Sequence, residues 1–143
     1  MHSHITKIVA INSTHSLFLT DRGELFGCGL NEDCQLGLGH KVNQTRWVKL
    51  SQLKNNRAIA AGSTHSLLIS EAGEILGCGS NQFGQLGLNH TEDQARWVKL
   101  NDSTNIKSIV AGDGFSMMIT ENGELFGCGK NNNGQLDVEN ISS

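Results

Sequence analysis

The sequence predicts an all-β protein built from repeated four-stranded units, and three observations support this prediction. The segment GELFGCGLNEDCQLGLG at 23–39 recurs fifty residues later as GEILGCGSNQFGQLGLN, and again as GELFGCGKNNNGQLDVE. Residues 5–54 align with residues 55–104 without a gap, and almost half of the aligned positions are identical. No segment shows a helical period of apolar residues over ten or more positions. A fixed period of this length is typical of solenoids, propellers and arrays.

The first strand of each repeat is expected at Lys7–Ile11 and at its counterparts fifty and one hundred residues later. A turn follows, which contains Gly62 and Gly112 in the later repeats and Asn12 in the first. Because asparagine is the residue that most readily replaces glycine at positive φ, the exchange predicts a left-handed turn residue at this position.

The second strand is expected at HSLFLT (15–20), which recurs as HSLLIS and FSMMIT. Its continuous apolar run predicts burial on both faces. The short turns DRGE, EAGE and ENGE then predict a hairpin whose glycine has positive φ. The third strand, LFGCG or ILGCG, carries glycines and a small cysteine, which predicts a crowded place where backbones approach closely.

The fourth strand is expected at RWVKL (46–50 and 96–100), after a polar loop with the pattern NxxxQLG. Four antiparallel strands in each unit of this length describe propeller blades. We therefore expect a single repeat domain over 1–143, with repeats at 5–54, 55–104 and 105–143 and the last one truncated. About three blades would form an incomplete propeller arc.

Composition narrows the class of protein. The formal net charge of −3 gives no basic surface of the kind that nucleic-acid binding needs, so a nucleic-acid partner is not expected. No apolar run is long enough to span a membrane, and the N-terminus lacks a signal-peptide pattern. The four cysteines form no CxxC pair, which favours reduced thiols. We expect an intracellular protein, cytoplasmic or nuclear, without a membrane partner.

No catalytic, metal or cofactor site is expected from the residues that carry chemistry. His15 and His65 each lie in STHS, but a catalytic group is not needed once in every repeat, and adjacent residues of a strand point to opposite faces. The repeated cysteines lie in successive units, too far apart for one metal ion. The Gly-rich loops lack the P-loop pattern. We expect the histidines to be structural, the cysteines to be buried thiols and the glycines to serve in turns.

Partner-binding residues are expected in two places. In RWVKL, the tryptophan and lysine alternate with valine and leucine, so each indole lies either on an exposed contact surface or over the seam with the next unit. The NxxxQLG loops vary where the frame around them is constant, which is typical of positions for partner contacts. The candidates are Glu32, Asp33, Gln82, Phe83, Asn132, Asn133, Trp47 and Trp97.

These residues resemble the regulator of chromosome condensation repeats. The family pattern runs Gly-x-x-His-Ser, apolar strand, acidic-x-Gly, strand, Gly-x-Asn-x-x-Gly-Gln-Leu-Gly, and GSTHSLLISEAGEILGCGSNQFGQLG (62–87) matches it closely. The first repeat departs from it at Asn12 and Cys34, and the third departs at Phe115 and Asp137. The resemblance extends over almost the whole chain and implies blades of a seven-bladed β-propeller.

The resemblance implies a protein-interaction module that acts by surface recognition. Some relatives are guanine-nucleotide exchange factors for a Ran-type small GTPase, so exchange activity on such a GTPase is an alternative. The sequence shows no inserted β-wedge of the kind that the exchange factors carry, so no functional residue is transferred from them. A self-assembling structural protein, including a homo-oligomer that completes a propeller ring, is a further alternative.

Overall fold

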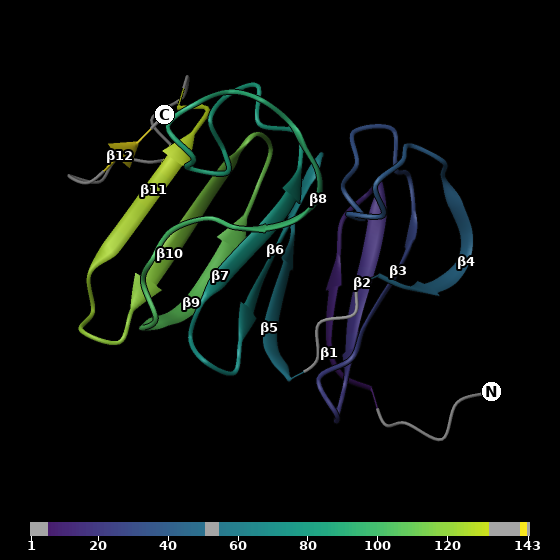
Figure 1. Cartoon of the computed structure of the whole chain (residues 1–143), viewed down its shortest axis with the longest axis horizontal. Coiled ribbons are helices and arrows are strands. Elements are labelled where there is room, and N and C mark those ends of the chain that lie inside the picture. Colours follow the sequence, from purple (N-terminus) through teal and green to yellow (C-terminus); the bar gives the residue numbers. More distant parts are fainter. Residues whose placement is uncertain (1–5, 51–54, 132–140, 143) are drawn as a thin grey trace.

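Three four-stranded β-sheets stand side by side in chain order in the computed structural model, which describes residues 6–50, 55–131 and 141–142 (Figure 1). The strands follow one another within each sheet as β1-β2-β3-β4, β5-β6-β7-β8 and β9-β10-β11-β12. We call these the first, middle and third sheets. Their strands are β1 (Thr6–Ile11), β2 (His15–Thr20), β3 (Leu25–Gly29), β4 (Gln44–Lys49), β5 (Asn56–Ala61), β6 (His65–Ser70), β7 (Ile75–Gly79), β8 (Gln94–Lys99), β9 (Ile106–Ala111), β10 (Phe115–Thr120), β11 (Leu125–Gly129) and β12 (Ile141–Ser142). The predicted all-β repeat architecture is confirmed.

The third sheet differs from the other two at its outer edge. In the middle sheet, β7 and β8 are antiparallel, with Gly77 opposite Val98. In the third sheet, β12 contributes only two residues and runs parallel to β11, with Gly127 opposite Ile141. Four antiparallel strands are therefore confirmed for the first two sheets, and the third repeat, which was expected to be truncated, has three antiparallel strands and the short parallel β12.

Each sheet has a forward face, directed to the next sheet along the chain, and a rear face. At the first seam, Leu17, Leu19 and Leu25 on the forward face of the first sheet pack against Ile59 and Leu68 on the rear face of the middle sheet. The second seam repeats this arrangement: Leu67, Ile69 and Ile75 of the middle sheet pack against the third sheet, at Ile106 and the partly buried Met118. The core thus consists of two seams between sheets.

The position of a sheet decides how its second strand is buried. In β6, five consecutive residues from His65 are buried, because the middle sheet is covered on both faces. In β2, Ser16 and Phe18 on the rear face are only partly buried. Burial on both faces, predicted for all three copies, is therefore found in the middle one, where a neighbour packs on each side.

Glycines occupy two kinds of position. The hairpin glycines Gly23 and Gly73 have φ of 74° and 82°, as predicted. The left-handed residue expected at Asn12 and at Gly62 and Gly112 is wrong, since none of the three has positive φ. Gly62 is required for space instead, because a Cβ there would collide with the ring of His65. Asn12 uses its side-chain Oδ1 to accept a hydrogen bond from the N–H of Thr14 at 3.3 Å.

Candidate interaction surface

A buried asparagine organises each long loop between the third and fourth strands. Asn31 is fully buried; its Nδ2 donates to the carbonyl of His40 at 2.8 Å and its Oδ1 accepts from the N–H of Leu36 at 3.0 Å. Asn81 makes the same pair of bonds, to His90 at 2.7 Å and from Leu86 at 2.9 Å. One side chain thereby joins the two ends of the loop and holds its tip in one conformation.

A glutamine at the end of each tip fastens the loop to the next sheet. The side-chain Oε1 of Gln35 accepts from the N–H of Asp33 at 2.9 Å, which fixes the backbone of the tip. The main-chain carbonyl of Gln35 accepts from the Ser66 hydroxyl at 2.5 Å and from the Cys78 thiol at 3.4 Å, both in the middle sheet. The tip is therefore part of the seam rather than a free loop.

The tips project different side chains from this common frame. In the first tip, Glu32 is exposed and Asp33 is partly exposed; in the second, Gln82 is exposed and Phe83 is 49% exposed. The Nζ of Lys130 lies 5.4 Å from the centroid of the Phe83 ring, within the range of a cation–π contact. Asn132 and Asn133, the candidates in the third tip, lie outside the described residues.

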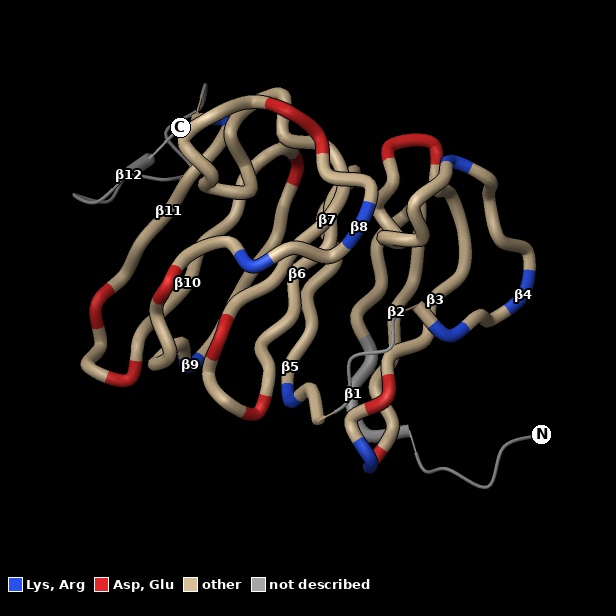
Figure 2. Tube along the Cα trace, in the orientation of Figure 1, with Lys and Arg blue, Asp and Glu red and all other residues tan. Residues whose placement is uncertain are grey.

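These tips lie at one end of the molecule. Figure 2 shows acidic stretches where the β3–β4 and β7–β8 loops cap the first and middle sheets, and acidic hairpins at the opposite end. Cys34 stands where the middle loop has Gly84, and it takes φ of 63° against 75° for the glycine. The first tip therefore keeps the left-handed backbone of the glycine-containing tip despite the substitution, and the two tips share one shape but differ in charge.

The two predicted structural histidines bridge the seams. The Nε2 of His15 lies 2.8 Å from the Oγ of Ser66, and the Nε2 of His65 lies 2.8 Å from the Oγ of Ser116. Because the Ser66 hydroxyl donates to the Gln35 carbonyl, His15 is the donor in its pair with Ser66. The serine proton is committed elsewhere and both histidines are buried, so this pair is not arranged for nucleophilic catalysis.

Burial sets the protonation of these histidines. It lowers the pKa of His15 from 6.5 to about 4. Burial also lowers the pKa of His65 to about 4, with a smaller lowering from the charge of His15. Both imidazoles are therefore neutral at pH 7, and the bond to Ser66 places the single ring proton of His15 on Nε2.

The repeated cysteines are free thiols: Cys78 and Cys128 are buried in the two seams, and Cys28 is partly buried in the first sheet. Burial raises the pKa of Cys78 well above its usual value and that of Cys128 to about 11, so both are protonated at neutral pH. Cys128 donates to the carbonyl of Gln85 at 3.2 Å, as Cys78 does to Gln35. Within 6–50, 55–131 and 141–142, no group of three or more His, Cys, Asp or Glu residues is arranged to hold a metal ion. The same ranges contain no helix long and apolar enough to cross a membrane.

The two candidate tryptophans occupy equivalent positions but different surroundings. Trp97 packs against the first seam, over the loop of the preceding sheet. Trp47 is 48% exposed and contacts Phe18 edge-on, with ring centroids 4.7 Å apart. Phe18 in turn stacks on Phe26 at 5.0 Å. Of the two roles considered from the sequence, Trp97 covers a seam, whereas Trp47 belongs to an aromatic cluster on the open rear face of the first sheet.

Sequence reasoning missed Asn31 and Asn81, on which the loop geometry depends. Their signal was present, because both stand at the start of the repeated NxxxQLG pattern. An invariant polar residue in a variable loop indicates a side chain that bonds the loop's own backbone. The buried glutamines of the same pattern carry the same signal.

Models of one family match most of the chain. A model described as the regulator of chromosome condensation (RCC1) repeat matches residues 5–35, 57–85 and 106–135, and a second model of the same description matches 22–69 and 72–119. A human RCC1-like G exchanging factor-like protein is 59% identical over 32 residues, which are 22% of this chain and 7% of that protein. A mouse secretion-regulating guanine nucleotide exchange factor is 46% identical over 48 residues, 34% of this chain and 10% of that protein.

Solved structures agree with this match over nearly the whole chain. Prp20p from Saccharomyces cerevisiae superimposes with a TM-score of 0.81 and 27% identity, covering 92% of this chain and 32% of Prp20p. Human WBSCR16 superimposes with a TM-score of 0.77 and 28% identity, covering 89% of this chain and 34% of that one. This chain therefore spans about a third of the length of these relatives and matches part of their propellers.

Proposed function

Because this chain belongs to the regulator of chromosome condensation (RCC1) repeat family, we propose that it is a protein-interaction module that recognises its partner through the loop tips. The contact surface consists of Glu32 and Asp33 in the first tip and Gln82 and Phe83 in the second. Recognition at this surface requires no bond-breaking chemistry. It takes place in the cytoplasm or the nucleus, where buried thiols stay reduced.

The observation that carries this proposal is the rigid frame beneath variable side chains. Asn31 and Gln35, with their counterparts Asn81 and Gln85, fix the backbone of each tip by hydrogen bonds between 2.7 and 3.0 Å. A partner that binds such tips does not have to order them first, which saves conformational entropy on association. The exposed phenylalanine of the second tip provides an apolar anchor, and the acidic pair of the first tip provides polar contacts.

Regulation of nucleotide exchange on a Ran-type small GTPase is the second candidate. It is supported by the similarity to a human RCC1-like G exchanging factor-like protein over 32 residues and to a mouse secretion-regulating guanine nucleotide exchange factor over 48 residues. The Prp20p structure was reported with that protein's binding properties to Gsp1p and histones. In this mechanism the module would bind the nucleotide-free GTPase more tightly than the loaded form and thereby shift its equilibrium towards nucleotide release.

Self-assembly is the third candidate, and the two ends of the arc support it. The rear face of the first sheet exposes Ile11 and Trp47, and the forward face of the third sheet exposes Val110 and Ile119. These are the two kinds of face that meet at each internal seam, so a second copy is a suitable cover. Light scattering that shows only monomer at high concentration would exclude it.

Binding measurements with a matched pair of variants test the main proposal. The chain is immobilised and probed with a nucleotide-free Ran-type GTPase and with core histones. We expect Glu32→Ala/Asp33→Ala/Phe83→Ala to weaken binding at least about tenfold. The control, Glu71→Ala/Glu121→Ala, removes acidic residues from the hairpins at the opposite end and is expected to bind as the unaltered chain does.

Equal loss in both variants, or no loss in the tip variant, would contradict the proposed surface. Release of a fluorescent nucleotide from the GTPase then separates exchange activity from plain binding. If the chain binds the GTPase but does not accelerate nucleotide release at micromolar protein, the chain is an interaction module and exchange activity is excluded.

A further inference from the structure

The first seam shows how a tryptophan from a fourth strand is accommodated. A Cβ added to Gly37 would lie 2.5 Å from both Cδ1 and Nε1 of Trp97 and 3.1 Å from the Sγ of Cys78. The indole therefore rests directly on the bare backbone of Gly37, beside the cysteine of the third strand. The N–H of Gly39 donates to the carbonyl of Ala95 at 2.9 Å and holds the loop against β8. The fourth strand of the middle sheet thus fills this position with an aromatic ring.

The second seam has a cavity at the equivalent position. It has a volume of about 210 Å³, and among its lining residues are Gly87 and Cys128, the counterparts of Gly37 and Cys78. Of the described residues outside Gly87's chain neighbours, only Cys128 comes within 4 Å of a Cβ added at Gly87, with its Sγ at 3.4 Å. The place that Trp97 occupies in the first seam is therefore a hollow in the second.

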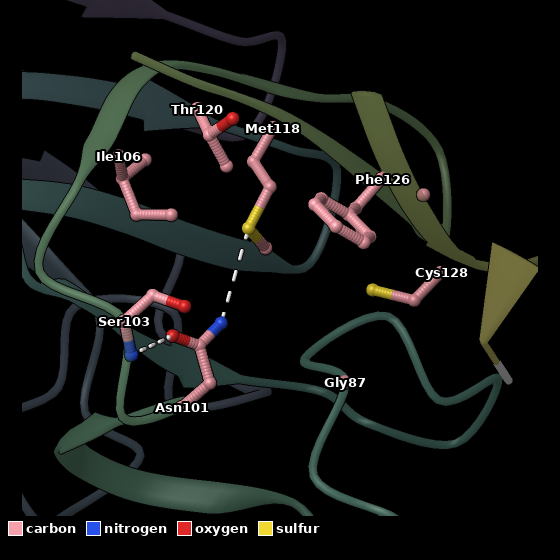
Figure 3. A pocket seen from close by; sticks show the side chains of 9 residues that line it. Gly87, Asn101, Ser103, Ile106, Met118, Thr120, Phe126 and Cys128 are labelled. Atoms are coloured by element: carbon pink, nitrogen blue, oxygen red, sulfur yellow. Dashed lines mark hydrogen bonds between the residues drawn. The ribbon is translucent and has the colours of Figure 1, made fainter. Parts of the chain in front are cut away.

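The walls of this cavity suit an indole. Figure 3 shows Met118, Phe126 and Cys128 directed into the hollow, with Asn101 and Ser103 on the opposite side. Two sulfur atoms and an aromatic ring provide polarisable contacts for a large flat side chain. The Asn101 amide donates to the Sδ of Met118 at 3.9 Å, and its Oδ1 accepts from the N–H of Ser103 at 2.9 Å. The Ser103 hydroxyl is a polar partner within this wall for an indole N–H.

The neighbouring sheet edge suits an incoming strand. In the middle sheet, β7 pairs with β8 through Leu76 with Lys99, Gly77 with Val98 and Gly79 with Gln94. In the third sheet, within the part of the chain that the structure describes, the corresponding edge of β11 pairs through two residues of β12, in the parallel direction. A six-residue antiparallel strand would form a longer ladder there than β12 does.

We propose that the outer edge of β11 and the cavity beside it form a docking groove for a tryptophan-bearing extended segment. The segment has the pattern Gln-x-Arg-Trp-Val-Lys-Leu found in both complete repeats, runs antiparallel to β11 in place of β12, and inserts its indole between Gly87 and Phe126. Main-chain hydrogen bonds supply affinity and the indole pocket supplies specificity, as in other cases of strand addition.

The groove is tested on the intact chain with the synthetic peptide EDQARWVKLN, which reproduces residues 92–101. The peptide carries 5-fluorotryptophan. Its ¹⁹F signal reports on the peptide alone, because the protein's own tryptophans contain no fluorine. We expect saturable binding with a shifted, broadened ¹⁹F resonance. Amide NMR shifts are expected at Gly87, Asn101, Ser103 and Cys128, and not at the equivalent positions of the first seam, which serve as the internal control.

Two peptides test the role of the tryptophan. Replacing it by alanine is expected to weaken binding at least about tenfold, because the largest buried contact is lost. Replacing the preceding arginine by alanine is the matched control and is expected to change affinity by less than about threefold. A peptide that does not bind at millimolar concentration, or that binds equally well without its tryptophan, overturns the proposal.

The position of the shifts and the mass of the protein decide the remaining cases. Shifts centred on Phe18 and Trp47 would place the peptide on the aromatic cluster of the first sheet and overturn the groove. Peptide binding that weakens as protein concentration rises, together with a dimer in light scattering, would make a second copy the occupant and also overturn it.

Discussion

Ile69 in the middle sheet and Ile119 in the third occupy the same position of the same strand, yet Ile69 is completely buried and Ile119 is 38% exposed. Both lie on the forward face of their sheets. Ile69 has the third sheet in front of it, whereas no described sheet packs in front of Ile119. The difference shows that a strand in this protein acquires its burial from the neighbouring sheet and not from its own sequence. The seams, rather than the individual sheets, are therefore the units of stability.

The largest effect is expected from protonating the seam histidines. The pKa of His15 and His65 is about 4 in the folded protein and 6.5 in the unfolded chain, so the unfolded chain binds more protons between these values. Stability is therefore full above pH 6.5 and falls as the pH drops towards 4. The loss is on the order of 3 kcal/mol for each histidine. Urea unfolding at pH 7, 6, 5 and 4.5 measures it.

The third repeat offers the matched variant for this experiment. In the third repeat, Phe115 occupies the histidine position and its ring packs on Gly112. His65 packs on Gly62 in the same way, so the variant His65→Phe has room for its ring. This variant is expected to remove about half of the acid-dependent loss while the His15 part remains. An unchanged slope between pH 6.5 and 4 would show that the acid sensitivity arises elsewhere.

The next largest effect is expected for Ile69 and Ile119, and it tests the comparison between the two sheets directly. Ile69→Ala is expected to lower the free energy of unfolding by about 2–5 kcal/mol, because it leaves a cavity inside the second seam. Ile119→Ala removes the same atoms from a partly exposed position and is expected to cost less than about 1 kcal/mol. Chemical denaturation of both variants measures the difference. Equal losses would mean that the forward face of the third sheet is also covered in solution.

The smallest effect on stability is expected for the two tryptophans, which compare a covered position with an open one. Trp97→Ala uncovers Gly37 and the first seam, and we expect a loss of about 2 kcal/mol. Trp47→Ala removes one edge-on contact with Phe18, and we expect about 1 kcal/mol. Thermal unfolding followed by circular dichroism distinguishes the two, with the single-tryptophan fluorescence of each variant as a check on folding. A larger loss for Trp47→Ala would place the more important contact on the open face.

Local patterns account for the parts of the fold that depend on one repeat alone. The strands at His15–Thr20 and Leu25–Gly29, the hairpin glycine Gly23 and the crowded Gly27 could all be predicted from residues near them in sequence. The effects of apolar runs, positive-φ glycines and small residues depend on a few neighbouring positions. These features can therefore be predicted without a structure. The tip loops were also found this way, as variable segments in a constant frame.

The amino-acid sequence alone is enough to identify the repeat: an all-β unit of fixed length, its strands and its exposed tips. The contacts between neighbouring units arise only in the folded molecule. The tertiary structure paired His15 with Ser66, covered Trp97 but not Trp47, turned Gly62 into a spacing residue, and left a hollow beside Phe126. Identical sequence positions have different surroundings because each seam is made by two repeats, and no repeat on its own contains the contacts of the next.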